Sequence, residues 1–259
     1  AAGFFALGVL INLGPRIGKF NADGTANDLS GHNMPFTATG LMLIIVGFWG
    51  FLMACMILPG EGWSWTANTG TTIYGTPMNL SALSFNILMG ICGGVIGAWL
   101  LNRDPFWMMS GALAGIISVA SGLDIYFPAL AFIVAIVAGL LLRPAAKMLE
   151  AFGIDDAVGA VTVHGTIGVY GMVVFGVFAQ GYPALFIDNA PTVSILGQLV
   201  GAIVTSLCGF IPGYLLSLGL SGLGMLRTPE AAEIAGLDTT KVPAQAFPEG
   251  IPASAQPAE

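Results

Sequence analysis

The stretch "DDAVGAVTVHGTIGVYG", residues Asp155 to Gly171, places a histidine inside a run of small and apolar residues. The chain has only two histidines, so His164 needs an explanation. Its imidazole either makes a hydrogen bond to a neighbouring helix or lines a path through a membrane for a small polar solute. Which interpretation applies depends first on whether the chain lies in a membrane.

The composition predicts a membrane protein. Hydrophobic residues make up 56% of the 259 residues and charged residues 8%, whereas ordinary soluble domains have roughly 45–50% and about 25%. The 37 glycines and a mean hydropathy of +0.86 point the same way, because membrane helices tolerate glycine and pack through it. A soluble protein this apolar would expose large hydrophobic patches.

Several other classes of function are excluded by the residues present. Seven basic residues form no patch for nucleic acid, and the net charge of −7 does not imply a basic partner. The three cysteines fall inside apolar runs and are interpreted as small core residues. We find no nucleophile–base pair, metal cluster or phosphate-binding loop, so we predict neither an enzyme nor a cofactor.

Apolar runs long enough to cross a bilayer of about 30 Å predict an all-α polytopic membrane protein. We predict six transmembrane helices within residues 36–226, at Phe36–Pro59, Met78–Leu101, Phe106–Ser121, Pro128–Leu142, Ala157–Ala179 and Thr192–Leu226. Before them, residues 1–14 are apolar but only about 21 Å long as a helix. We interpret this segment as the end of a truncated transmembrane helix, which makes the bundle incomplete at its N-terminus.

The basic residues predict the orientation of the helices. With this set of segments, Arg16, Lys19, Arg103, Arg143, Lys147, Arg227 and Lys241 all fall on one side. The positive-inside rule makes that side cytoplasmic. Residues 15–35 are then a cytoplasmic loop and residues 227–259 a cytoplasmic C-terminal tail, whose last dozen residues we expect to be disordered. This describes a multi-pass protein of the cell (inner) membrane.

His164 and His32 differ in their predicted surroundings. His164 lies about eight residues into its predicted segment, roughly 12 Å deep by helical rise. Both the path and the interhelical hydrogen bond remain open for it. His32 lies in a polar loop, where we expect Asn33 to cap the helix that begins near Pro35. Glycine pairs four residues apart predict close helix contacts, namely Gly90/Gly94, Gly93/Gly97, Gly111/Gly115, Gly197/Gly201 and Gly209/Gly213.

Three motifs together resemble the ammonium transporter family (Amt/MEP/Rh). They are "GHNMPF…GFWGF", "GIDDAVGAVTVHGTIGVYG" and "LRTPEAAEIAGLD", in that order. Members of the family have "HNLP…GWFGF", "DD…FGVHG" and a tail reading "P.E.E..GLD". The resemblance covers nearly the whole chain, as the last seven of the family's eleven transmembrane helices. It implies transport of ammonium or ammonia through a hydrophobic, histidine-lined pore.

The resemblance implies roles for individual residues. His164 matches the second of the family's two pore histidines, and the first would fall a few residues before Ala1. Phe51 matches one phenylalanine of the stacked gate. Asp155 and Asp156 match the acidic pair that supports the start of the pore helix. A set of tail residues matches the motif that contacts the neighbouring subunit of a homotrimer, near the docking surface of a PII-type regulator: Gly236, Leu237 and Asp238.

Some positions depart from the family's pattern. The family's tryptophan and serine of the outer cation site are Phe48 and Cys55, and an aspartate five residues before the pore histidine is Gly159. A thiol is a poorer acceptor than a hydroxyl, so ordinary recruitment of ammonium is in question. Two alternatives therefore stay beside transport: an ammonium sensor, and a structural membrane subunit with a degenerate pore. For transport, the N-terminal half would come from the same or a separate chain.

Overall fold

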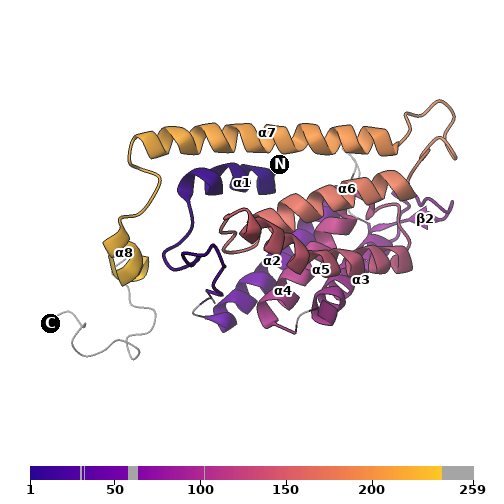
Figure 1. The fold of residues 1–259 in the computed structure, drawn as a ribbon. Coiled ribbons are helices and arrows are strands. Elements are labelled where there is room, and N and C mark those ends of the chain that lie inside the picture. Colours follow the sequence, from indigo (N-terminus) through magenta and orange to yellow (C-terminus); the bar gives the residue numbers. More distant parts are fainter. Residues whose placement is uncertain (30, 32, 58–63, 102, 241–259) are drawn as a thin grey trace.

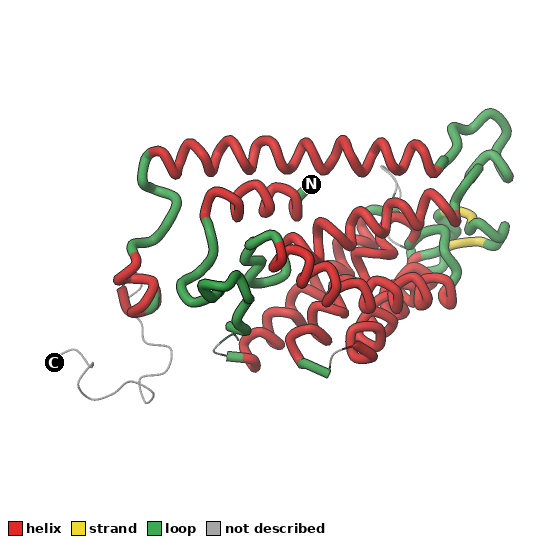
Figure 2. Tube along the Cα trace, in the orientation of Figure 1, coloured by secondary structure: helices red, strands yellow, loops and turns green. Residues whose placement is uncertain are grey.

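The computed structural model describes residues 1–29, 31, 33–57, 64–101 and 103–240. Within these residues the fold is almost entirely helical (Figures 1 and 2). The α-helices are α1 Ala2–Leu13, α2 Met34–Ala54, α3 Leu80–Leu101, α4 Pro105–Val119, α5 Pro128–Ala151, α6 Ile167–Phe178, α7 Ile195–Gly222, α8 Glu230–Ala235 and α9 Leu237–Thr240. A 3₁₀ turn, η1 (Ala120–Gly122), follows α4, and a π-helix, η2 (Ala160–Thr166), leads into α6. Strands β1 (Gly70–Thr71) and β2 (Pro77–Met78) form an antiparallel hairpin in which Gly70 pairs with Met78.

The predicted class is confirmed, and some predicted helix ends are wrong. Six helical spans of the described residues are long and apolar enough to cross a membrane. Helix α2 ends at Ala54, before the predicted Pro59, and α5 runs on to Ala151 instead of stopping at Leu142. The apolar run ends near Arg143, but the helix does not, because Ala145, Ala146 and Leu149 still face the interior. An apolar run in the sequence predicts which residues are buried in the membrane or the core. The ends of a helix depend on local hydrogen bonding and are not predicted by such a run.

The centre of the bundle is formed by α3, α4 and α5, which pack through small residues. A Cβ atom at Gly94 would collide with the carbonyl oxygen of Gly111, and one at Gly97 with that of Ile136. Backbones this close require residues without a side chain. The glycine pairs predicted in α3 and α4 are therefore packing contacts. The pair Gly197/Gly201 is not one, because its nearest neighbours are side-chain atoms and not another backbone.

Helix α1 lies between the long helix α7 and the π-helix η2, and Figure 1 shows it beneath α7. On the α7 side, a Cβ atom at Gly213 would collide with the carbonyl oxygen of Phe5. The Asn12 amide donates to the Ser217 hydroxyl at 2.8 Å. On the other side, a Cβ atom at Gly3 would collide with the backbone of Gly165. The start of α1 is thus packed directly against the residue that follows His164.

Helix α2 packs against α3 and α4 but leaves most of its surface exposed. The predicted cap is present, since the Asn33 side chain accepts from the Phe36 amide at 2.9 Å. Trp49 donates its indole N–H to the Ser84 hydroxyl on α3 at 2.7 Å. Large apolar side chains such as Leu43 and Val46 are about 70% exposed. Such faces require lipid or further protein to cover them.

Candidate functional site

The π-helix η2 carries His164 and begins at a turn built by Asp156. The Asp156 carboxylate accepts hydrogen bonds from the Val161 amide at 3.1 Å, from the Thr162 amide at 2.8 Å and from the Thr162 hydroxyl at 2.9 Å. Gly159 precedes the helix with φ of 73°, a conformation in which glycine is favoured. Helix η2 has seven residues, and π-helices are rare elements that are frequently found at functional sites.

His164 is exposed on the surface of this chain. Within the described residues its imidazole has no hydrogen-bond partner, so the interhelical hydrogen bond considered above is not found there. Its predicted depth needs correction, because the helix starts at Ala160 and not at Ala157. The histidine is the fifth residue of its span, roughly 6 Å from the start by helical rise.

Near the end of α2, the structure brings Phe48 and Phe51 together. Their rings meet edge-to-face, with centroids 6.4 Å apart and an interplanar angle of 81°. Phe48 packs against the core, whereas Phe51 is 61% exposed. Cys55 follows as the exposed C-cap of the helix. These three residues lie on one helix, on a different element from His164.

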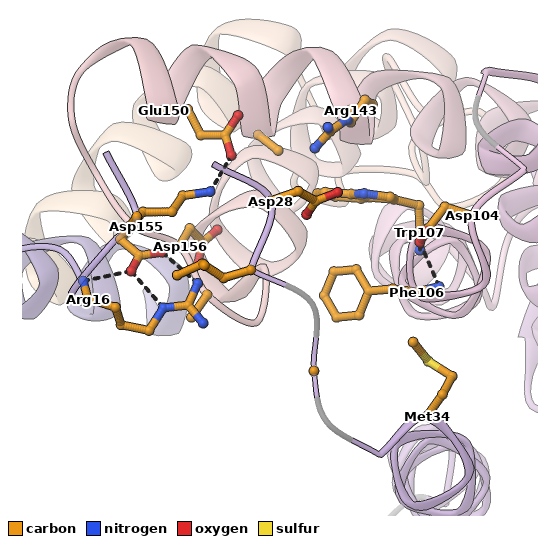
Figure 3. Close-up of a pocket in the computed structure, with 15 residues that line it drawn as sticks. Arg16, Asp28, Met34, Asp104, Phe106, Trp107, Arg143, Glu150, Asp155 and Asp156 are labelled. Atoms are coloured by element: carbon orange, nitrogen blue, oxygen red, sulfur yellow. Dashed lines mark hydrogen bonds and ion pairs between the residues drawn. The ribbon is translucent and has the colours of Figure 1, made fainter. Parts of the chain in front are cut away.

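Asp155 and Asp156, predicted to act as one acidic pair, have different partners. Asp155 is 5% exposed and accepts from the Arg16 backbone amide at 2.9 Å, from Nε at 2.7 Å and from Nη2 at 2.9 Å. Burial by itself would raise the pKa of Asp155, but the hydrogen bonds and charge of Arg16 outweigh it and lower that pKa. Asp155 therefore ties the loop after α1 to the start of η2, as Figure 3 shows.

A second ion pair stands beside the first and helps to line a polar cavity of about 120 Å³ (Figure 3). Lys19 is buried and donates from Nζ to Glu150 at 2.7 Å and to the Asn27 carbonyl at 3.0 Å. Arg143 lines the same cavity, with its guanidinium 5.0 Å from the centre of the Trp107 ring. Sequence reasoning missed the Arg16 and Lys19 pairings. The sequence offered one indication of these pairings, namely two basic residues close together in a chain that has only seven.

An apolar cavity of about 360 Å³ adjoins this polar one and shares Arg16 and Met34 with it. It is lined by α2, by α4 and by Val158, just before η2. Ser110 contributes a hydroxyl to this lining and is 7% exposed. Among the described residues that hydroxyl has no hydrogen-bond partner, whereas Ser118 on the same helix donates to the Gly115 carbonyl at 2.8 Å.

The tail contacts the loop after α1. Arg227 donates to the Leu13 carbonyl at 3.2 Å and pairs with Glu233 at 3.0 Å. Glu233 also accepts from the Ile17 amide at 2.9 Å. Gly236 ends α8 with φ of 94°, and Leu237 is exposed at the start of α9. Asp238 follows within α9. The predictions for His32 and for the end of the tail fall on residues outside the described ranges.

These features define a class of protein: a multi-pass helical membrane protein with a histidine on a membrane span that begins as a π-helix. The sequence profile of the Ammonium Transporter Family matches residues 1–247. The chain therefore belongs to the ammonium transporter family. This family consists of membrane transport proteins, in agreement with the prediction that the chain is not an enzyme.

Relatives of known name cover almost the whole chain. It is 33% identical over 250 residues to "Ammonium transporter Amt2" of Methanocaldococcus jannaschii, covering 95% of this chain and 54% of that protein. It is 29% identical over 264 residues to "Ammonium transporter Amt2" of Archaeoglobus fulgidus, covering 96% and 53%. The chain thus spans about half the length of these relatives.

Solved structures share the fold. "Sensor Amt Protein" matches with a TM-score of 0.75 at 24% identity, over 92% of this chain and 56% of that one. The Rh50 protein of Nitrosomonas europaea matches with a TM-score of 0.62 at 20% identity, over 96% and 58%. At these identities the likeness concerns the helical architecture alone.

Proposed function

We propose that this chain forms one wall of a pore that moves ammonium or ammonia across the cell (inner) membrane. The observation that carries the proposal is His164, whose imidazole is exposed on a π-helix within a membrane span and has no hydrogen-bond partner among the described residues. A polar ring at that position is costly unless it faces a wet cavity or a polar solute. The names of the relatives supply the solute, since they are ammonium transporters.

Neutral imidazole suits this role chemically. It offers one hydrogen-bond donor and one acceptor, so it can accept a proton from ammonium or hydrogen-bond to ammonia. Moving a whole hydrated cation through an apolar pore is costly, so loss of a proton at the entrance lowers the barrier. K⁺ has no proton to lose, and selectivity against K⁺ follows.

The outer end of the pore is formed by α2 in this proposal. Phe51 acts as the gate above His164, and Phe48 and Cys55 replace the polar groups of the outer cation site. Aromatic faces still attract a cation, but a thiol supplies a weaker acceptor than a hydroxyl. We expect recruitment of ammonium to be weak, with transport becoming appreciable only at high ammonium concentration.

In this proposal the inner exit passes through the apolar cavity lined by α2, α4 and Val158 and then through the polar cavity. Ser110 offers a hydroxyl to a passing ammonia molecule because no other residue in the described chain occupies it. Beyond it, the carboxylates of the polar cavity favour the protonated form on exit. We expect Ser110→Ala to reduce flux modestly, with Ser118→Ala as the matched control on the same helix.

The orientation and assembly are part of the same proposal. Basic residues gather at the end of the bundle that carries the polar cavity. By the positive-inside rule this supports a cytoplasmic position for that end and for the C-terminal tail. The proposal keeps the domain arrangement expected from the sequence, with residues 15–35 and 227–259 in the cytoplasm. Gly236, Leu237 and Asp238 would contact a neighbouring subunit of a homotrimer, where a PII-type regulator could dock. The exposed faces of α2 and α7 would be covered partly by an N-terminal half, supplied by the same or a separate polypeptide.

The deciding experiment measures ammonium-evoked current and pH change in vesicles that contain the native protein. We expect His164→Ala to alter or abolish the signal and His32→Ala, at the chain's other histidine, to leave it unchanged. Both variants are checked for insertion and thermal stability. Ammonium binding without current would indicate a sensor instead. No current and no binding would refute the proposal and leave a structural subunit.

A further inference from the structure

Two fully buried polar atoms lie where α3 meets the turn between α4 and α5, in the core against which Phe48 packs. One is the amide oxygen of Asn86, two turns into α3. Asn86 is 0% exposed, and its Nδ2 donates to the Leu123 carbonyl at 2.9 Å and to the Tyr126 carbonyl at 2.8 Å. Because only the NH₂ group can donate, these bonds fix the amide orientation. Its Oδ1 acceptor is left without a partner within the described residues.

The other atom is the hydroxyl of Tyr126, which is also 0% exposed and has no partner in the described chain. The ring folds back over Gly122, where a Cβ atom would collide with it, and its centroid lies 6.4 Å from that of Phe175. Burial raises the pKa of the Tyr126 hydroxyl above its ordinary value, so it remains a proton donor at neutral pH. The other tyrosines of this region differ: Tyr170 donates to the Val134 carbonyl at 3.0 Å and Tyr182 to the Thr71 carbonyl at 2.8 Å.

Both residues contact the turn that follows η1, Asn86 from helix α3 and Tyr126 from within the turn. Leu123 and Tyr126, whose carbonyls hold the Asn86 amide, follow directly on the Gly122 that the Tyr126 ring covers. Buried polar groups in folded proteins are nearly always satisfied, by protein or by an ordered small molecule. One of these atoms is an acceptor that needs a donor, and the other is a donor that needs an acceptor.

We propose that Asn86 and Tyr126 form a binding site for one small neutral solute that both donates and accepts hydrogen bonds. Water and ammonia meet this requirement. Ammonium and metal cations do not, because they have no lone pair to accept the proton of the Tyr126 hydroxyl. The site does not depend on transport through the His164 pore, so either proposal can fail alone.

The experiment compares thermal unfolding of the purified native protein in detergent with that of two conservative variants. Tyr170→Phe removes a hydroxyl with a direct protein partner and sets the reference, a fall in Tm of roughly 2–4 °C. If a solute is bound, Tyr126→Phe lowers Tm by a similar amount. An unchanged or raised Tm for Tyr126→Phe overturns the proposal, because removal of an unpartnered buried hydroxyl costs nothing.

Two further arms identify the solute and guard against a variant that does not fold. Wild type and Tyr126→Phe are unfolded in ammonium chloride and in matched sodium chloride at alkaline pH, where ammonia is present. A rise in Tm with ammonium that Tyr126→Phe loses assigns ammonia, and a Tm independent of ammonium assigns water. If Tyr126→Phe cannot be purified, an experimental map that resolves ordered water must show density within hydrogen-bond distance of Asn86 Oδ1 and Tyr126 Oη. Absence of that density overturns the proposal.

Discussion

The ion pair between Arg16 and Asp155 makes a sharp test of how the loop after α1 is anchored. We consider Asp155→Asn, which keeps the shape of the side chain and removes its charge. The carboxylate accepts three hydrogen bonds from Arg16 and its side chain is 3% exposed, whereas that of Arg16 is 41% exposed. Exposed ion pairs contribute about 0–1 kcal/mol to the free energy of unfolding, and breaking a fully buried ion pair lowers it by about 3–5 kcal/mol. Because the guanidinium can rehydrate, we expect an intermediate loss of about 1.5–3 kcal/mol in the free energy of unfolding.

A double-mutant cycle measures the interaction itself. Asp155→Asn, Arg16→Met and the double variant are unfolded by titration with SDS, and the coupling energy is taken from the four free energies. We expect a coupling of about 1–2 kcal/mol. The more exposed pair of Arg227 and Glu233, with side chains 40% and 24% exposed, is the control and should give a clearly smaller coupling energy. Equal coupling in the two pairs would refute the reasoning from burial.

The same pair predicts how stability depends on pH. The pKa of Asp155 is lowered in the folded state, so its contribution is fully present above the unfolded pKa of about 3.9. It is lost as pH falls through the lower folded value. The stability difference between wild type and Asp155→Asn should therefore stay constant from neutral pH to about pH 5 and narrow only below about pH 4. Narrowing near pH 6 would show that another group controls the loop.

Three further predictions concern packing and helix ends. Gly94→Ala should prevent normal folding or lower the free energy of unfolding by at least about 1–3 kcal/mol, because a Cβ atom there meets backbone atoms. Gly47→Ala, in open space on α2, should be neutral. Expression yield and Tm of the two variants test this. Asn33→Ala should cost about 1 kcal/mol through loss of the α2 cap, measured by unfolding in SDS, and Asn33→Asp should retain most of it. Trp49→Phe should cost about 0.5–1.5 kcal/mol through loss of its bond to α3; no loss in the same assay would mean that packing alone holds α2.

The presence of the membrane-spanning helices was predictable from the sequence, because burial in lipid requires long apolar runs. A membrane-spanning helix needs about 20 mainly apolar residues in a row, and a helix satisfies its backbone hydrogen bonds within its own segment. The Asn33 cap was also predictable, because it involves only residues three apart. The extension of α5 past Arg143 was not predictable, because the continuous apolar run ends there. Beyond it only one face of the helix is buried, and polar residues interrupt the apolar pattern.

The candidate site was predictable in its residues but not in its geometry. The single histidine in an apolar run, and the two aspartates before it, stood out from composition alone. The different partners of the two aspartates could not be predicted, because Arg16 lies 139 residues from Asp155 along the chain. The π-helix likewise depends on where the Asp156 carboxylate reaches, which places His164 nearer the start of its span than a regular helix from Ala157 would.

The order of residues was therefore enough to establish a multi-pass membrane protein, the concentration of basic charge at one end, and the family. These properties follow from runs, spacings and counts, which do not change with the path of the chain. The tertiary structure decided the packing of α1 against η2 and the exposure of the His164 ring. It also decided that one polar atom each of Asn86 and Tyr126 is buried without a partner among the described residues. Each of these is a relation through space, set by which helices can approach closely where glycine leaves room.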